Sequence, residues 1–149
     1  MQILFIGSYT EWILPDFGGT GQGIYTVGLN PETGALRVLH SVAARNPSYL
    51  TLSPDQQFLY AATELFEKDE PKVSAYKINT DYSLTLINEQ PVDGGLPCHL
   101  QVWEENVLVA CYESGNLLQF PLEKSGALQP ASHNYSHEGS SVNPERQES

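Results

Sequence analysis

An internal repeat of about 49 residues constrains this chain more than any other feature. The stretch NPSYLTLSPDQQFLYAATE, residues 46–64, returns as LPCHLQVWEENVLVACYES, residues 96–114, and a Glu lies near the end of each copy. The N-terminal LFIGSY, residues 4–9, matches the apolar run of both copies. This period lies at the long end of those known for β-propeller blades, and far from the common helical repeats. The repeat therefore favours a chain of similar β units.

Each unit contains four runs that are typical of β-strands. In the central unit they are rich in Val, Ile, Tyr, Phe and Thr and are bounded by Pro, Gly, Asp and Asn, and no stretch has a helical period. Four antiparallel strands per unit make a propeller blade. We therefore predict an all-β fold, a partial β-propeller of about two to three four-stranded antiparallel blades. The expected bounds are blade one 1–42, blade two 43–92, blade three 93–132 and the start of the next unit 133–149.

The number of units is too small to close a ring, because propellers typically use four to eight blades. The opening strand matches the second strand of a blade and has no first strand before it, and the polar tail from Ala131 leads toward a further unit. We therefore expect a piece of a larger ring. Bare interblade surface at both ends predicts self-association through exposed blade edges.

Charge and targeting signals narrow the function classes. The chain carries 18 acidic and only 7 basic side chains, for a net charge of −11. This balance argues against nucleic acid or an anionic membrane as the main partner, because both need a basic surface. The N-terminus lacks the basic and long apolar segments of a signal peptide or a membrane span, so we expect a cytoplasmic protein. Cys98 and Cys111 are too few for a disulfide framework and are expected to be buried free thiols.

Propeller geometry gathers the polar residues of the repeat on one face. The starts of first strands and the ends of second strands share that face, and the first strand lines the central channel. A cleft with carboxylates, an imidazole and phenols suits general acid-base chemistry. The alternative interpretation is that the Glu residues are solvated loop residues and His99 a hydrogen-bonded rim histidine. The candidates at this rim are Tyr9, Asn46, Tyr49, Glu64, His99, Tyr112 and Glu113.

No metal or cofactor site is predicted. The glycine-rich stretch 18–23 precedes a strand and lacks the Lys of a phosphate-binding loop, so it is expected to be a flexible connection. On that connection, Trp12 and Phe17 either cap a ligand or pack on the blade. A loose group of metal-ligating residue types has no zinc spacing: His133, His137 and Glu138.

Several motifs, in order along the chain, resemble those of the β-propeller lactonase family of the bacterial 6-phosphogluconolactonase type. They are GSYT from Gly7, GIYTVGLNPETGAL from Gly23, NPSYLTLSPDQQFLYAATE from Asn46, PCHLQV from Pro97, ACYESGNLLQFPL from Ala110 and NPERQES from Asn143. NPSYL with SPD, PCH and the closing RQ are the more specific ones. The resemblance implies a seven-bladed parent of more than twice this length, of which this chain is the N-terminal portion.

The resemblance also implies an activity, namely hydrolysis of 6-phosphogluconolactone to 6-phosphogluconate in the pentose phosphate pathway. A phosphorylated sugar lactone would be the partner, and no metal or other cofactor would be needed. The implied catalytic residues are Glu64, His99 and Arg146, with His99 or Glu64 activating water and Arg146 gripping a phosphate or carboxylate. Substrate-binding supports at the rim are Asn46, Tyr49, Tyr112 and Glu113. Many members have Asn-Tyr-Gly-Ser-Gly where this chain has CYESG, residues 111–115, so Glu113 rests on the repeat alone.

Two other functions remain open at this point. One is a binding or scaffold propeller without catalysis, since a fold does not settle a function. The other is a lactonizing cycloisomerase of the muconate type, because the chain is also similar to fungal propellers of that activity. Convergence of Glu64, His99 and Arg146 on one ligand would favour hydrolysis, whereas an apolar, aromatic rim would favour protein binding.

Overall fold

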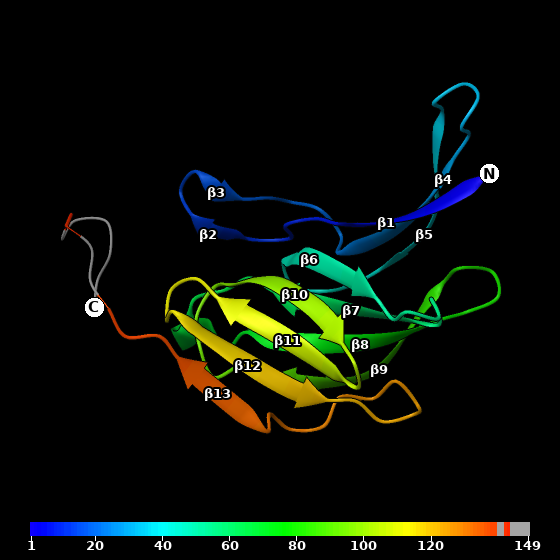
Figure 1. Ribbon diagram of the computed structural model, residues 1–149. Helices are drawn as coiled ribbons and strands as arrows, with labels where there is room; N and C mark the ends of the chain where they lie inside the picture. The colour runs from blue at the N-terminus through cyan, green and yellow to red at the C-terminus, as the bar shows by residue number, and fades with distance from the viewer. Residues whose placement is uncertain (140–141, 144–149) are drawn as a thin grey trace.

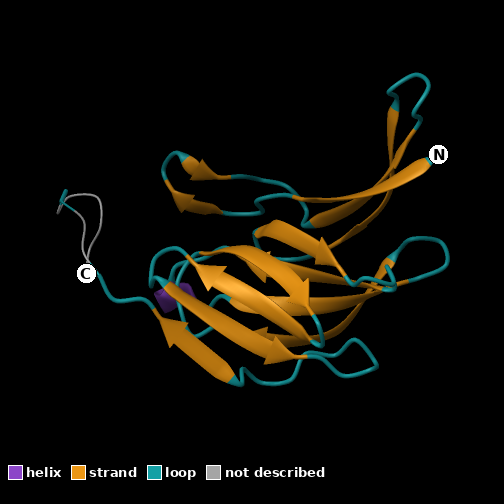
Figure 2. Cartoon of the chain, viewed as in Figure 1, coloured by secondary structure: helices purple, strands orange, loops and turns teal. Residues whose placement is uncertain are grey.

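The computed structural model describes residues 1–139 and 142–143, and its regular structure is almost entirely β-strand (Figure 2). Most strands form three antiparallel sheets, with the orders β1-β4-β5, β6-β7-β8-β9 and β10-β11-β12-β13, and β2 pairs with β3 in a separate two-stranded hairpin (Figure 1). We call them sheets one, two and three. The bounds are β1 Gln2–Gly7, β2 Trp12–Leu14, β3 Phe17–Gly18, β4 Ile24–Leu29, β5 Leu36–Val42, β6 Pro47–Leu52, β7 Phe58–Thr63, β8 Lys72–Ile78, β9 Leu84–Pro91, β10 Pro97–Trp103, β11 Asn106–Cys111, β12 Asn116–Pro121 and β13 His133–Ser136. A single 3₁₀ turn, η1, spans Glu67–Asp69.

The repeat in the sequence corresponds to these sheets. Sheets two and three are four-stranded antiparallel blades, which confirms the predicted all-β, partial β-propeller fold. Sheet one has three strands, and β1 takes the place that β7 and β11 take in the other sheets. The register shows this equivalence, because Gly7 lies opposite Ile24, Ala62 opposite Val73 and Ala110 opposite Leu117. The opening strand is therefore the second strand of its blade, as the sequence predicts.

One expected boundary differs from the structure. We placed the end of blade three at residue 132, but β13 pairs with β12 as the fourth strand of sheet three, with Asn116 opposite Ser136. All four residues of β13 are exposed. A strand without a buried face lacks the alternation of apolar and polar residues that marks strands in a sequence, so this segment was assigned to the next unit.

Buried apolar side chains join neighbouring sheets along two seams. The second seam, between sheets two and three, holds the larger cluster of buried residues, which is Tyr60, Ala62, Val73, Ala75, Val92, Leu100, Val107, Val109, Cys111, Leu118, Phe120 and Leu128. The first seam, between sheets one and two, holds the smaller cluster of Ile24, Leu59, Ala61 and Tyr76. Burial of apolar area is the main stabilising contribution in such packing. The apolar core therefore holds sheet one less firmly than it holds sheets two and three together.

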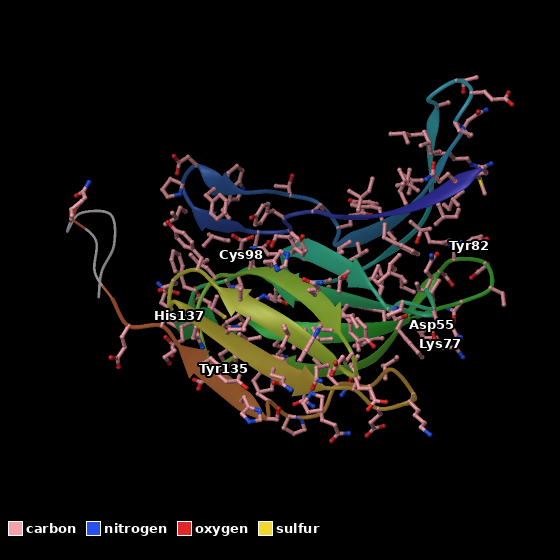
Figure 3. The ribbon with its side chains drawn as sticks, in the orientation of Figure 1. Asp55, Lys77, Tyr82, Cys98, Tyr135 and His137 are labelled. Carbon is pink, nitrogen blue, oxygen red and sulfur yellow. The ribbon has the colours of Figure 1, made fainter. Side chains whose placement is uncertain are left out.

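The connections lie at two opposite ends of the molecule. Figure 3 shows Asp55, in the turn after β6, and Tyr82, in the turn after β8, at one end, with Cys98 toward the other. This arrangement agrees with the predicted sorting of turns between the two faces of the ring. The starts of β6 and β10 therefore share the end that we call the rim.

Sheet one has an exposed apolar face. Its side chains line a shallow hollow of about 300 Å³, formed by Ile6, Tyr25, Val27, Leu36 and Val38. Leu36 and Val38 are among the most exposed large apolar residues. Self-association through such a surface stays a prediction. In the described part of the chain, no helix has the length and apolar character needed to cross a membrane.

Candidate functional site

At the rim, the first strands of sheets two and three start with the same backbone conformation. Asn46 and Leu96 both have a positive φ, of 37° and 48°, and each precedes the proline that opens β6 or β10. The register then shifts at the next residue, which is Ser48 in β6 and Cys98 in β10. A β-bulge leaves one residue out of the ladder and re-aims its side chain. We call the two sites the Asn46 corner and the Leu96 corner.

Glu64, directly after β7, is bonded across the first seam to the segment that follows β1. The Tyr9 hydroxyl donates a hydrogen bond to Glu64 Oε2 at 2.7 Å, between the end of sheet one and the end of β7. Burial, followed by the hydrogen bond to Glu64, raises the pKa of Tyr9 well above its ordinary value. The phenol therefore keeps its proton and remains a hydrogen-bond donor at any physiological pH.

Asn46 is fully buried, so it lies beneath the rim surface. Its Oδ1 accepts hydrogen bonds from the backbone N–H of Thr10 at 2.8 Å and of Glu11 at 3.1 Å. Its Nδ2 donates to the carbonyl of Glu64 at 3.5 Å, and its own carbonyl accepts the Glu64 N–H at 3.0 Å. We expected Asn46 to bind substrate. That role stays a prediction; in the structure the Asn46 side chain holds Glu64 and the segment after Tyr9 together.

Tyr49 and His99 are adjacent at the exposed surface of the rim. Their ring centroids are 4.6 Å apart with an interplanar angle of 53°, and both residues are exposed. Cys98 was expected to be buried, but it is an exposed free thiol next to His99, and only Cys111 is buried. Partial burial and then the negative charge of Glu64 raise the pKa of Cys98, so it favours the neutral thiol. The structure thus brings Tyr9, Tyr49, Glu64, Cys98 and His99 to one rim.

Tyr112 and Glu113 occupy different places from those that the repeat suggested. Aligned by eye, Glu113 matches Glu64, but the backbone register makes Tyr112 the equivalent residue. Glu64 N–H bonds the carbonyl of Asn46, and Tyr112 N–H bonds the carbonyl of Leu96 in the same way. The Tyr112 side chain is 77% exposed. One carboxylate oxygen of Glu113 accepts the backbone N–H of Glu67 at 3.1 Å, at the start of η1.

The offset has a structural cause in the turn between the first two strands of each blade. Five residues, 53–57, separate β6 from β7, whereas two residues, 104–105, separate β10 from β11. Since β10 is also one residue longer than β6, the second copy returns to the rim two residues sooner than the first, at Tyr112. Equal-length alignment of the two copies therefore cannot identify the equivalent of Glu64.

The remaining predicted residues add little to the rim. Arg146 lies outside the described residues. In residues 1–139 and 142–143, no group of three or more His, Cys, Asp and Glu side chains could hold a metal ion. His133 instead stacks on Tyr135, with ring centroids 5.5 Å apart. Phe17 packs edge-on against Tyr9 at 5.1 Å, so of the two interpretations of this side chain the structure supports packing.

Two parts of the rim were not predicted as functional. The bulge residues Ser48 and Cys98 follow a proline in each copy, and their shared place in the repeat was the only available signal. Tyr9 was placed at the rim but given no role, because a pairing across 55 residues has no local signature. The tyrosine becomes informative only when the fold brings β1 beside sheet two.

Comparisons with known proteins identify the family. Residues 3–149 match the family described as lactonase, 7-bladed beta-propeller. The chain is 34% identical, over 97% of its length, to the 6-phosphogluconolactonase of Bacillus subtilis (strain 168), and it spans 40% of that relative. It is 27% identical, over 93% of its length, to the 6-phosphogluconolactonase of Formosa agariphila, of which it spans 39%.

Solved structures agree with this match. A Bacteroides fragilis protein, provisionally assigned as a 6-phosphogluconolactonase, superposes with a TM-score of 0.87 and 37% identity, over 97% of this chain and 39% of its own. The periplasmic gluconolactonase of Pseudomonas aeruginosa superposes with a TM-score of 0.79 and 25% identity, over 95% of this chain and 40% of its own. The chain therefore spans about two fifths of the length of these relatives. With three sheets of propeller type and a match over nearly all its residues, the chain belongs to the lactonase family of seven-bladed β-propellers.

Proposed function

We propose that this chain forms part of the rim site of a propeller that hydrolyses 6-phosphogluconolactone to 6-phosphogluconate. The observation that carries the proposal is Glu64, whose carboxylate is held at the rim by Tyr9 at 2.7 Å. The exposed His99 and Tyr49 lie at the same rim. The 6-phosphogluconolactonases of Bacillus subtilis and Formosa agariphila are relatives of this chain, which supports the choice of substrate.

The rim groups suit ester hydrolysis by general acid-base catalysis. Water attacks the lactone carbonyl carbon while Glu64, or His99 in its place, takes the proton. The bond from that carbon to the ring oxygen then breaks, and the ring oxygen takes up a proton to become a hydroxyl group. Exposed donors such as the Tyr49 hydroxyl would stabilise the oxyanion. The products are the open-chain carboxylate and its new hydroxyl.

A phosphorylated substrate needs a cation at the rim of this acidic chain. Arg45 is already paired, because its Nε donates to Glu11 Oε1 at 2.7 Å, and that hydrogen bond raises the pKa of Arg45. Arg146 remains the proposed phosphate-binding residue of this chain. A guanidinium can grip phosphate with two parallel hydrogen bonds. Tyr112 and Glu113 stay proposed substrate contacts, with Glu113 the weaker because of its bond to Glu67.

The first test is an assay of the complete gene product against phosphorylated and unphosphorylated gluconolactone. We expect a rate well above the spontaneous one, and loss of about 10²- to 10⁴-fold in kcat for Glu64→Gln. Glu32→Gln, in an exposed turn, is the matched control and should keep full activity. Arg146→Ala should raise KM for the phosphorylated lactone only.

Other outcomes would support the alternative functions. A protein that hydrolyses no lactone but captures other proteins would be a scaffold propeller. Lactone formation from an unsaturated diacid would indicate a cycloisomerase. We also propose the cytoplasm as the compartment, supported by the two free thiols Cys98 and Cys111. Activity recovered only with the periplasmic fraction of the source cells would contradict it.

A further inference from the structure

The hydrogen bond between Tyr9 and Glu64 joins two blades at the rim, where neither side chain is fully buried. Its length of 2.7 Å is ordinary for a hydroxyl that donates to a carboxylate, a pairing in which the charge of the acceptor strengthens the bond. Core packing does not require this contact, because neither residue belongs to the buried clusters of the two seams. Packing of the apolar core therefore does not explain this polar contact at the rim.

The Tyr9 side is held by the β2–β3 hairpin and the connection after it. The Phe17 ring packs edge-on against Tyr9, and the Gly21 N–H donates to the Tyr9 carbonyl at 2.7 Å. Gly19 approaches so closely that a Cβ there would lie 3.0 Å from the Tyr9 carbonyl oxygen. This hairpin lies across the rim end in Figure 1. The phenol is therefore presented in a fixed position rather than from a free loop.

The Glu64 side is held by the buried Asn46. That side chain bonds the backbone directly after Tyr9, through Thr10 and Glu11, and the backbone of Glu64. One buried amide therefore sets the spacing of the two chain segments, and the phenol-carboxylate bond fixes the side chains above it. Groups that must act together at a site need this kind of support from beneath.

The bond also leaves Glu64 with one oxygen available. Tyr9 occupies Oε2, and among residues 1–139 and 142–143 no hydrogen bond to Oε1 is found. A carboxylate with one oxygen anchored and the other open is suited to accept a proton from water. The anchored oxygen fixes the rotamer of Glu64, and the open oxygen accepts the proton.

We propose that Tyr9 is the positioning residue of Glu64 and aims its free carboxylate oxygen at the water that attacks the lactone. This inference rests on the proposed function, in which Glu64 is the general base. Tyr9 acts through Glu64 and has no part in substrate binding. Its removal should therefore lower kcat and leave KM almost unchanged.

The test is Tyr9→Phe in the complete gene product. This variant keeps the ring that packs on Phe17, so it should fold. We expect kcat to fall about 10- to 100-fold, the size of effect that misplacement of a catalytic group produces. The matched control is Tyr82→Phe, an exposed tyrosine at the opposite end of the molecule (Figure 3), which should keep full activity. An unchanged kcat in Tyr9→Phe, or an equal loss in Tyr82→Phe, would overturn the inference.

A double variant tests that Tyr9 acts through Glu64. In a Glu64→Gln background, Tyr9→Phe should cost nothing further, because the group that it positions is already absent. If the double variant instead showed the full product of the two single losses in kcat, Tyr9 would act by another route. Different results would contradict the proposed function itself. They are an unmodified protein that hydrolyses no lactone, or a Glu64→Gln variant that keeps full activity.

A titration measures the pair without reference to activity. With tyrosines labelled at the ring Cζ carbon, the NMR titration of Tyr9 should move to lower pH in Glu64→Gln, because Glu64 helps to raise the pKa of Tyr9. An unmoved titration would contradict the pairing itself. If the titration moves while Glu64→Gln remains fully active, the pair is a structural contact only, and the positioning role is overturned.

Discussion

The Asn46 corner and the Leu96 corner share a backbone and differ in what holds them to the preceding sheet. Both have a positive φ before a proline. The Asn46 N–H donates to the Thr10 side chain at 3.1 Å, whereas the Leu96 N–H donates to the Leu65 carbonyl at 2.7 Å. Only Asn46 reaches across the seam with its own side chain. The repeat conserves the path of the chain, and single side chains make one corner different from the other.

The difference between the corners follows that between the seams. The second seam combines the larger apolar core with polar bonds such as Glu67–Glu113 and Asn88–Leu128, while the first seam has a small core beside the polar network of Asn46. That network includes the Tyr9–Glu64 pair. The candidate site therefore lies where polar contacts, rather than apolar burial, determine the geometry.

Asn46→Leu should cause the largest loss of stability, because it places at the Asn46 corner the residue type that the Leu96 corner has. The N–H groups of Thr10 and Glu11 would lose their acceptor in a partly buried place. Such losses cost about 1–3 kcal/mol for each unsatisfied group, so we expect about 2–4 kcal/mol in the free energy of unfolding. The measurement is urea denaturation of the complete gene product. Asn46→Asp keeps the accepting oxygen and should lose less; an equal loss in both variants would contradict this account.

Gly7→Ala should cause the next largest loss of stability. Sheets two and three carry alanine at the equivalent places, Ala62 and Ala110, but a Cβ on Gly7 would lie 1.8 Å from the carbonyl oxygen of Pro47. The backbones of the first seam would have to move apart, at a cost of about 1–3 kcal/mol. Gly139→Ala, in open space, is the control and should cost almost nothing. Thermal unfolding of the two variants makes the comparison, and equal midpoints would show that the seam absorbs the methyl group.

Tyr60→Phe tests one of the polar bonds across the second seam, in which the Tyr60 hydroxyl donates to the Gly126 carbonyl at 3.2 Å. Its loss should cost about 1 kcal/mol at neutral pH. Burial raises the pKa of Tyr60 from 10.0 to about 12. Because the neutral phenol is favoured in the folded state, its contribution is full below pH 10 and falls as pH rises toward 12.

Urea denaturation at several pH values checks this dependence. The difference in unfolding free energy between the unmodified protein and Tyr60→Phe should shrink from pH 10 to 12. Comparing the two proteins cancels the titration of Cys111, whose pKa burial raises to about 12 in both. A difference that stays constant over this range would contradict the assignment to Tyr60.

Leu96→Asn is the reciprocal change and should have the smallest effect. Leucine is strained at a φ of 48°, whereas asparagine tolerates the left-handed region. We expect a gain of up to about 1 kcal/mol, offset in part by lost apolar contact. Differential scanning calorimetry of the complete gene product would detect it. A clear loss would show that packing of the Leu96 side chain outweighs backbone strain.

Most of the fold was predictable, because strand patterns and turns recur at a fixed period. The site was predictable only in part. Propeller geometry placed Tyr9 and Glu64 on one face, but no sequence pattern indicates that Asn46 is fully buried, since asparagine is usually exposed. Glu113 was matched to Glu64 by letters alone, and a shorter turn moved Tyr112 into that place. Local signals predict elements well, but one-residue offsets between copies decide which side chain reaches the rim.

The bulges at Ser48 and Cys98 have a consequence for how such a protein can change over generations. A residue outside the ladder can be replaced while the hydrogen bonds on either side of it remain. Sheets two and three thus each offer one position near the rim at which a side chain can be exchanged with little risk to the sheet. New specificities can accumulate around the ring one blade at a time.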